Sequence, residues 1–176
     1  YRTTHKLFAV SGILFNHESP LRQNKFVISK IINGLIKVKK KEKTIIELGN
    51  INIKRDWGYS KEYVVQMWKM LQTKTPSDYV IASGKQYSVK EFVNFTLNEL
   101  KIKYSWKGKG IKSKCFDEKG RCIIECDKEY FRPLEVDTLL GNSRKALKEL
   151  KWKPKIHIKQ LIKEMVESEI SSIKND

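Results

Sequence analysis

The chain has 176 residues, of which 40% are hydrophobic, and it carries a formal net charge of +16. This apolar content, with four tryptophans and seven phenylalanines, excludes a wholly disordered polypeptide. The apolar runs fall short of the ~20 residues that a membrane-spanning helix needs, and no charged leader with an apolar core precedes Leu7. We therefore expect a soluble, cytoplasmic protein with no membrane partner and no signal peptide.

Helical and strand periodicities alternate along the chain, which favours an α/β fold. In order, the patterns predict a buried strand over 7–15, a helix over 26–39, a strand over 44–48, a helix around 63–71, a strand over 79–82 and a helix over 88–100. They then predict a hairpin within 103–126 with a polar, mobile connection over 108–120, a short helix over 141–150 and a final helix over 158–170. The second helix should face the core with Tyr63, Val64, Met67, Trp68 and Leu71. Ser88 and Glu91 have the spacing of a capping box.

The positive charge is mostly lysine and is concentrated only in the stretch 37–43. Charge alone indicates solubility and steering rather than fold, so we favour a solvated surface and do not expect nucleic acid as a partner. A basic nucleic-acid-binding module is the alternative from a different class of function, and it predicts steeply salt-dependent binding. The three cysteines are odd in number and form no C-x-x-C pair, so we expect reduced thiols and no metal site.

A dense set of polar groups follows the first predicted strand. Asn16, His17 and Arg22 supply amide, imidazole and guanidinium groups, and Pro20 forces the preceding residue into extended geometry. Because open α/β sheets bind ligands at the carboxyl ends of their strands, this loop is a candidate binding site. A polar strand-to-loop turn without a ligand is the alternative.

Three separate stretches each form a cluster of an arginine with acidic or aromatic residues: Arg22 with His17 and Glu18, Arg55 with Asp56 and Trp57, and Arg132 with Glu135. In a lysine-rich chain, this choice indicates bidentate contacts that lysine cannot make, and a diphosphate joined to a sugar is a fitting ligand. For each arginine, a structural salt bridge is the alternative. The sequence contains no G-x-G-x-x-G, P-loop, G-x-S-x-G or H-E-x-x-H motif, so we predict a ligand-binding chain without catalytic residues.

A series of short motifs carries a family resemblance. They are 12–20 (GILFNHESP), 54–58 (KRDWG), 78–84 (DYVIASG), 88–93 (SVKEFV), 130–137 (YFRPLEVD) and 152–154 (WKP). In this order, they resemble the carboxy-terminal half of the GDP-mannose 4,6-dehydratases, which are extended short-chain dehydrogenases/reductases. The resemblance implies the last strands and helices of a Rossmann-type sheet and the smaller mixed α/β substrate-binding domain, with all 176 residues forming one carboxy-terminal portion.

The resemblance also implies an activity for the parent enzyme, a lyase. Bound NADP oxidises C4 of the mannose in GDP-mannose, water is eliminated across C5 and C6, and the hydride returns at C6 to give GDP-4-keto-6-deoxymannose. The catalytic residues of the family match positions before residue 1, so the isolated chain is expected to be inactive. The parent is expected to be a homo-oligomer, dimeric or tetrameric. Another nucleotide-sugar epimerase or dehydratase of the extended family is the alternative.

Binding residues follow from the matched motifs. His17 and Arg22 are implied to contact NADP, and Asn16 to hold the nucleotide sugar. Substrate contacts are further implied for Val27, Lys30, Arg55, Arg132 and Glu135, the first two lining the approach to the guanosine diphosphate. The chain departs from the family pattern at Leu21, Ile28, Ser29 and Leu134, which affects cofactor and subunit contacts more than the substrate class.

Overall fold

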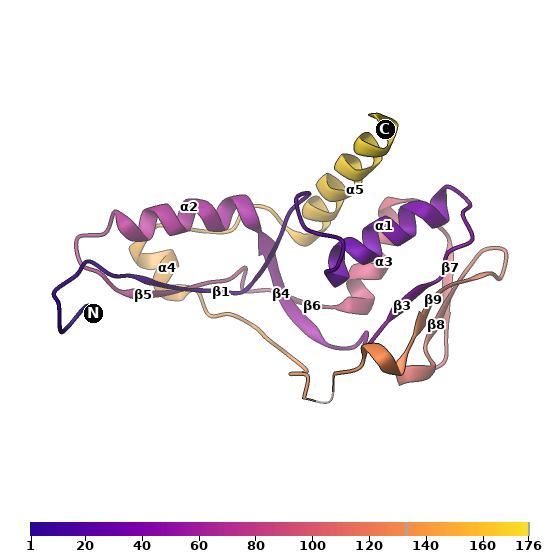
Figure 1. The fold of residues 1–176 in the computed structure, drawn as a ribbon, viewed down its shortest axis with the longest axis horizontal. Helices are drawn as coiled ribbons and strands as arrows, with labels where there is room; N and C mark the ends of the chain where they lie inside the picture. Colours follow the sequence, from indigo (N-terminus) through magenta and orange to yellow (C-terminus); the bar gives the residue numbers. More distant parts are fainter. Residues whose placement is uncertain (133, 176) are drawn as a thin grey trace.

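The computed structural model describes residues 1–132 and 134–175, and it confirms the predicted α/β class. Strands and helices follow one another along the chain, as Figure 1 shows. The elements are β1 (Ser11–Leu14), β2 (Asn16–Glu18), α1 (Val27–Lys39), β3 (Ile46–Leu48), β4 (Lys54–Tyr59), α2 (Ser60–Leu71), β5 (Asp78–Ile81), β6 (Gln86–Ser88), α3 (Val89–Glu99), β7 (Tyr104–Lys107), β8 (Lys114–Asp117), β9 (Cys122–Cys126), α4 (Arg144–Glu149) and α5 (Ile158–Asn175). Short 3₁₀ turns lie at η1 (Gly110–Lys112) and η2 (Lys128–Tyr130).

The described strands form three small sheets. β1 pairs with β5 in parallel, and β4 lies between β2, which is parallel to it, and β6, which is antiparallel. The third sheet has the order β3-β9-β8-β7, with only the first pair parallel. In Figure 1, β4 runs between the part that contains β1 and β5 and the part that contains the third sheet.

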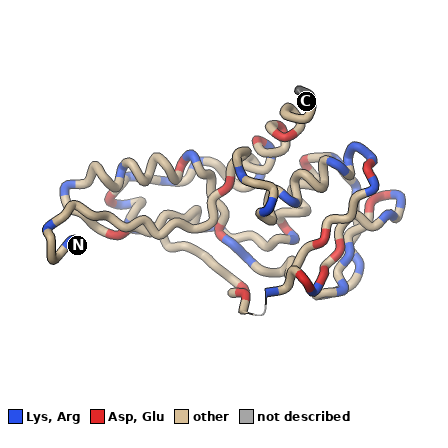
Figure 2. Tube along the Cα trace, in the orientation of Figure 1, with Lys and Arg blue, Asp and Glu red and all other residues tan. Residues whose placement is uncertain are grey.

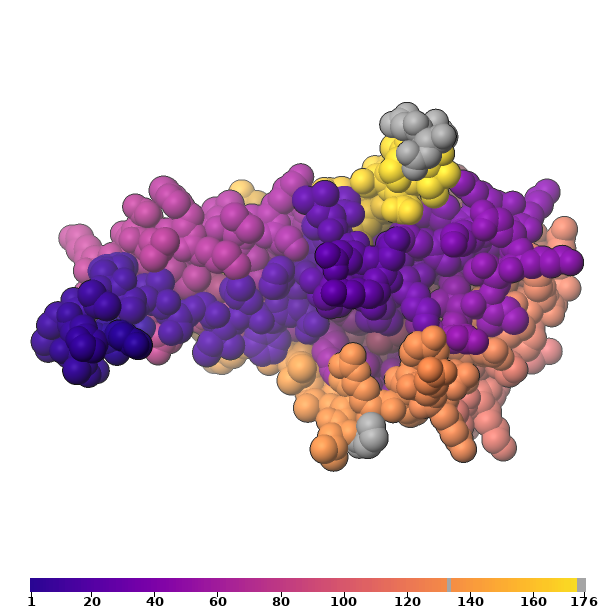
Figure 3. Space-filling model, in the orientation of Figure 1, coloured from indigo at the N-terminus to yellow at the C-terminus, as the bar shows by residue number. Residues whose placement is uncertain are grey.

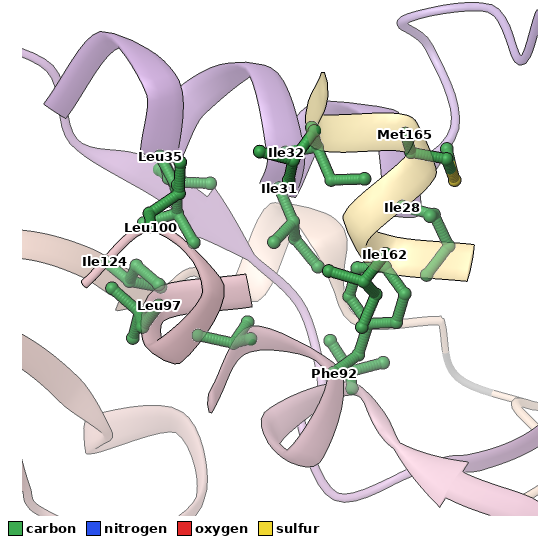
Figure 4. Close-up of a cluster of buried hydrophobic side chains, with 14 of the residues drawn as sticks. Ile28, Ile31, Ile32, Leu35, Phe92, Leu97, Leu100, Ile124, Ile162 and Met165 are labelled. Carbon is green, nitrogen blue, oxygen red and sulfur yellow. The ribbon is translucent and has the colours of Figure 1, made fainter. Parts of the chain in front are cut away.

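The main hydrophobic core forms where α1, α3 and α5 pack together. Ile31, Phe92 and Leu161 come from these three helices and are at most 1% exposed. Figure 4 shows side chains from α1, α3 and α5 pointing toward one another, with Ile124 of β9 beside them. Each fully buried side chain of this kind contributes about 1.5–3 kcal/mol, so the apolar stripes predicted for 26–39, 88–100 and 158–170 determine this packing.

A second core joins α2 and α4 to the β1–β5 sheet. It contains Tyr63, Met70, Tyr79, Ile81, Ala146, Leu150 and Trp152. Gly12 of β1 allows the close approach of α2, since a Cβ atom there would lie 3.0 Å from Met70 Cε. The capping box of α3 is also confirmed: the Glu91 backbone N–H donates to Ser88 Oγ, and the Ser88 backbone N–H donates to the Glu91 carboxylate.

Two predictions about apolar faces are wrong. The stretch 7–15 forms a strand only over β1, and Leu7, Phe8 and Ile13 are about half exposed. In α2, the inward residues are Tyr63, Gln66 and Met70, whereas Val64, Met67, Trp68 and Leu71 are exposed. The reason is the same in both places: apolar periodicity indicates a face suited to burial, but it does not identify which neighbouring element covers that face.

The predicted hairpin within 103–126 is a three-stranded meander. The stretch 114–117, which the sequence suggested was a polar connection, forms β8 and pairs with both β7 and β9. The turn after β8 is fixed by the Asp117 carboxylate, which accepts hydrogen bonds from the backbone N–H groups of Lys119 and Arg121 at 3.0 and 2.9 Å. Side-chain capping thus replaces the mobile connection that we expected.

Cys115, Cys122 and Cys126 are free, as predicted. Lys and Arg residues are spread along the whole trace in Figure 2 and do not gather on one element. Within the described residues, no helix combines the length and the apolar character needed to cross a bilayer. The same part of the chain contains no cluster of His, Cys, Asp and Glu suited to a metal ion.

Candidate functional site

The candidate substrate site is a cavity of about 710 Å³ lined by four separate stretches of the chain. Its walls come from β2 with the loop and first turns of α1, from β3 with the turn after it, from β4, and from the segment 129–137. Figure 3 shows the orange segment after β9 beside the indigo and purple residues that follow β2. Segments far apart in the sequence therefore line one cavity.

Seven of the eight residues predicted to bind ligands line this cavity: Asn16, Arg22, Val27, Lys30, Arg55, Arg132 and Glu135. The structure thus brings together the three arginines that the sequence places far apart. Pairing of β2 with β4 explains part of this convergence, because it sets Asn16 opposite Trp57, two residues beyond Arg55.

Arg55 is held by the protein itself in this structure. It is 8% exposed, its Nη1 donates to the carbonyl oxygens of Lys54 and Val136 at 2.8 and 2.7 Å, and its Nη2 pairs with the Glu135 carboxylate. The expected neighbour Asp56 is not its partner. Arg55 therefore both forms a structural salt bridge and lines the cavity, and it anchors the segment 135–136 to the cavity wall.

Arg132 differs from Arg55 because its side chain is exposed and only weakly paired. Its side chain is 82% exposed, and its Nε lies 3.8 Å from Glu135 Oε2, the usual separation of a weak surface ion pair. Glu135 thus receives two guanidinium groups, one buried and one exposed. Two cations around one carboxylate at a cavity wall form an arrangement that also suits a phosphate group.

Aromatic residues complete the larger cavity, and the sequence analysis assigned no role to them. Trp57, Phe131 and Tyr130 line it, and Lys30 Nζ lies 3.9 Å from the centre of the Tyr130 ring. Gly49 makes this arrangement possible, because a Cβ atom there would lie 2.1 Å from the Tyr130 carbonyl oxygen. The available signal was the placement of Tyr130 and Phe131 directly before Arg132 in the sequence.

A smaller cavity of about 360 Å³ adjoins the larger one and shares Asn16 and Arg22 with it. Leu14, Phe15, His17 and Leu139 form the rest of its lining. His17 Nδ1 lies 2.8 Å from the Phe15 carbonyl oxygen, which can only accept, so Nδ1 donates this hydrogen bond and the neutral form of the ring has Nε2 as its acceptor. The ring stacks on Tyr63 at 5.0 Å between centroids, which fixes its orientation.

Asp56 organises the loops next to the site. It is fully buried, and its carboxylate accepts hydrogen bonds from Ser83 Oγ and from the backbone N–H groups of Ser83, Gly84 and Gly141, at 2.6–3.2 Å. A buried carboxylate is tolerated when its lone pairs are satisfied in this way. Asp56 is therefore a structural residue that joins β4 to two distant loops.

A comparison with protein families shows which family the chain belongs to. The family model described as GDP-mannose 4,6 dehydratase matches residues 1–165. The chain belongs to the GDP-mannose 4,6-dehydratase family. It is 47% identical over 176 residues to GDP-mannose 4,6 dehydratase 2 of Caenorhabditis elegans and 46% identical over 176 residues to GDP-mannose 4,6 dehydratase of Dictyostelium discoideum. These alignments cover 100% and 99% of this chain but 46% and 49% of the two relatives, so the chain spans about half their length.

Solved structures agree with the dehydratase family at the level of fold. RMD from Pseudomonas aeruginosa complexed with NADPH matches with a TM-score of 0.78 at 18% identity, over 97% of this chain and 51% of that one. dTDP-glucose 4,6-dehydratase from Bacillus anthracis in complex with NAD matches with a TM-score of 0.77 at 17% identity, over 99% and 48%. These matches confirm the predicted α/β fold, which the chain shares with about half of each of these structures.

Proposed function

We propose that this chain supplies the substrate-binding part of a GDP-mannose 4,6-dehydratase, a lyase that converts GDP-mannose to GDP-4-keto-6-deoxymannose. The observation that supports the proposal is the convergence on one cavity of Asn16, Arg22, Val27, Lys30, Arg55, Arg132 and Glu135. The family membership and the identity to named dehydratases point in the same direction.

The chemistry of the larger cavity suits a nucleoside diphosphate sugar. Arg132 has an exposed guanidinium group for phosphate oxygens, and Arg55 presents a second one when Glu135 gives up its place. A carboxylate such as Glu135 accepts hydrogen bonds from sugar hydroxyls. Tyr130 and Trp57 offer flat aromatic surfaces against which a base or sugar ring packs.

We propose that the smaller cavity takes one end of the nicotinamide cofactor NADP. The residues fit this group: Leu14, Phe15 and Leu139 give an apolar wall, while Arg22 and the acceptor Nε2 of His17 are polar partners. When bound, NADP takes up and returns a hydride. The chain's own residues orient the reactants, because Asn16 and Arg22 line both cavities and so touch sugar and cofactor alike.

The proposal is tested by comparing nucleotide sugars. GDP-mannose, UDP-glucose and dTDP-glucose are added separately to the purified chain, and thermal unfolding is followed. At 100 times its Kd, a bound ligand stabilises the folded state by about 2.7 kcal/mol, which corresponds to a Tm increase of roughly 5–10 °C for a chain of this size. We expect this increase with GDP-mannose alone. An equal or larger increase with UDP-glucose or dTDP-glucose would reassign the chain to another nucleotide sugar.

A further inference from the structure

The carboxyl group of Glu18 is buried in the wall of the larger cavity. The residue is 2% exposed, and its Oε2 lies 3.0 Å from Nε of Arg22, four residues later in the chain. Within the described residues, neither atom has a hydrogen-bond partner of good geometry. The pair is therefore held by charge and proximity, and it stays sensitive to any third charge placed next to it.

Arg22 connects this pair to the ligand sites. It lines both the larger and the smaller cavity, and its Cζ lies 3.5 Å from the centre of the Phe26 ring. The hydrogen bonds of the described residues make no use of its Nη1 and Nη2 atoms. With Nε directed at Glu18 and one face of the guanidinium covered by Phe26, the two terminal nitrogens are the donors left for an anion.

We propose that Glu18 is a positioning residue that holds Arg22 for an anionic ligand and takes up one proton from solvent when that anion binds. An ionised Glu18 neutralises part of the charge of Arg22. An anion on the other side of the guanidinium repels this carboxylate in a poorly solvated wall, so the carboxyl group binds a proton. One O–H bond forms on Glu18, and no bond of the ligand breaks. The inference rests on the proposed function only for the identity of the natural anion, the diphosphate of GDP-mannose in the larger cavity, which Arg22 lines together with Arg55 and Arg132.

The electrostatics of the site support the geometry. Burial raises the pKa of Glu18 to about 7, and the guanidinium of Arg22 opposes this increase only in part. Tyr59 is the strand partner of Glu18 on β4, and its hydroxyl bonds to Glu164 of α5 near Lys61 of α2. Other charged or titratable groups near Glu18 are His17 on β2 and, in the same cavity, Lys25, Lys30, Glu47, Arg55, Glu129, Arg132, Glu135 and Asp137.

Calorimetric titration measures the proposed proton directly. Sulfate and GDP-mannose are titrated into the chain at pH 7.5 in buffers of different ionisation enthalpy, since neither probe changes its own charge near this pH. We expect uptake of up to about one proton per anion, and an affinity for sulfate that falls as much as tenfold per pH unit above pH 7. In Glu18→Gln, proton uptake should disappear and the affinity should no longer depend on pH in this range.

A matched variant separates Glu18 from its neighbours. Glu164→Gln removes a carboxylate that lies beyond Tyr59, and it should leave the proton uptake in place. Uptake that persists in Glu18→Gln, or that disappears in Glu164→Gln alone, overturns the assignment. Binding of GDP-mannose without proton uptake also overturns it while leaving the proposed function intact. Proton-coupled binding of sulfate without binding of GDP-mannose would support the role of Glu18 and contradict the proposed function. Failure to bind either probe contradicts both.

Discussion

Arg55 and Glu135 form an ion pair in the wall of the larger cavity, although 80 positions separate them in the sequence. The same guanidinium also donates to the Val136 carbonyl oxygen, so one side chain anchors the segment that carries Glu135. Under the proposed function, a diphosphate at Arg55 would compete with Glu135 for this guanidinium. Ligand binding and the position of the segment would then be coupled at a single residue.

Arg55→Ala should therefore affect both binding and stability. Losing a charge-assisted contact costs about 1.5–3 kcal/mol, so the affinity for GDP-mannose should fall roughly 10- to 100-fold. The free energy of unfolding should also fall, because the partly buried Glu135 loses its partner. Titration calorimetry and urea denaturation measure the two effects. Arg55→Lys keeps the positive charge but loses the bidentate guanidinium group. Its affinity for GDP-mannose and its free energy of unfolding should therefore lie between those of the wild type and of Arg55→Ala.

Arg132→Ala should separate the two effects. Its side chain is 82% exposed and its ion pair is long, so the free energy of unfolding should stay within about 0.5 kcal/mol of the wild type. The affinity for GDP-mannose should still fall about tenfold or more, since the contact to phosphate is lost. A destabilised variant with unchanged affinity would show that Arg132 is a structural residue.

The sequence predicted elements well where local signals determine them. The capping box at Ser88 and the apolar stripe of α1 are local, and both are found as expected. Glu18 was not predicted as a site residue, because its burial arises from the pairing of β2 with β4, which sets it opposite Tyr59. A single acidic residue after a strand carries no sign of such a neighbour.

The cavity itself was predicted by matched motifs rather than by periodicity. The motif that contains Arg55 and Asp56 was interpreted as one cluster, whereas the structure directs Arg55 to Glu135 and Asp56 to the loop at Ser83. Opposite faces of a strand explain the separation, because adjacent side chains point in opposite directions. Pairing between distant segments is tertiary information that spacing along the chain does not contain.

Gly49→Ala tests the shape of the larger cavity. A Cβ atom at this position would lie 2.1 Å from the Tyr130 carbonyl oxygen, so the backbone of η2 must move and carry the Tyr130 ring with it. We expect a loss of about 1–3 kcal/mol in the free energy of unfolding and a weaker affinity for GDP-mannose. Gly12→Ala is the control, since its new Cβ meets the flexible end of Met70 at 3.0 Å and Leu14 Cδ2 at an ordinary contact distance of 3.6 Å, and it should leave the affinity unchanged.

Glu18→Gln should change how stability depends on pH. Burial raises the pKa of Glu18 from 4.5 to about 7, so between these values the folded state keeps a proton that the unfolded state has lost. The wild type should therefore lose stability as pH rises from 4.5 to 7, by on the order of 3 kcal/mol, whereas the glutamine variant should lack this loss. Urea denaturation at pH 5 and pH 8 without added anions measures the difference, and a gap between the two proteins that is independent of pH would contradict the expectation.

The most direct test of the shared binding surface is a crystal structure of the chain with GDP-mannose bound. We predict that the diphosphate lies in the cavity of about 710 Å³, within hydrogen-bonding distance of the guanidinium groups of Arg55 and Arg132, with the sugar next to Asn16. A nucleotide sugar bound elsewhere on the chain, with both guanidinium groups still paired to Glu135, would contradict the account.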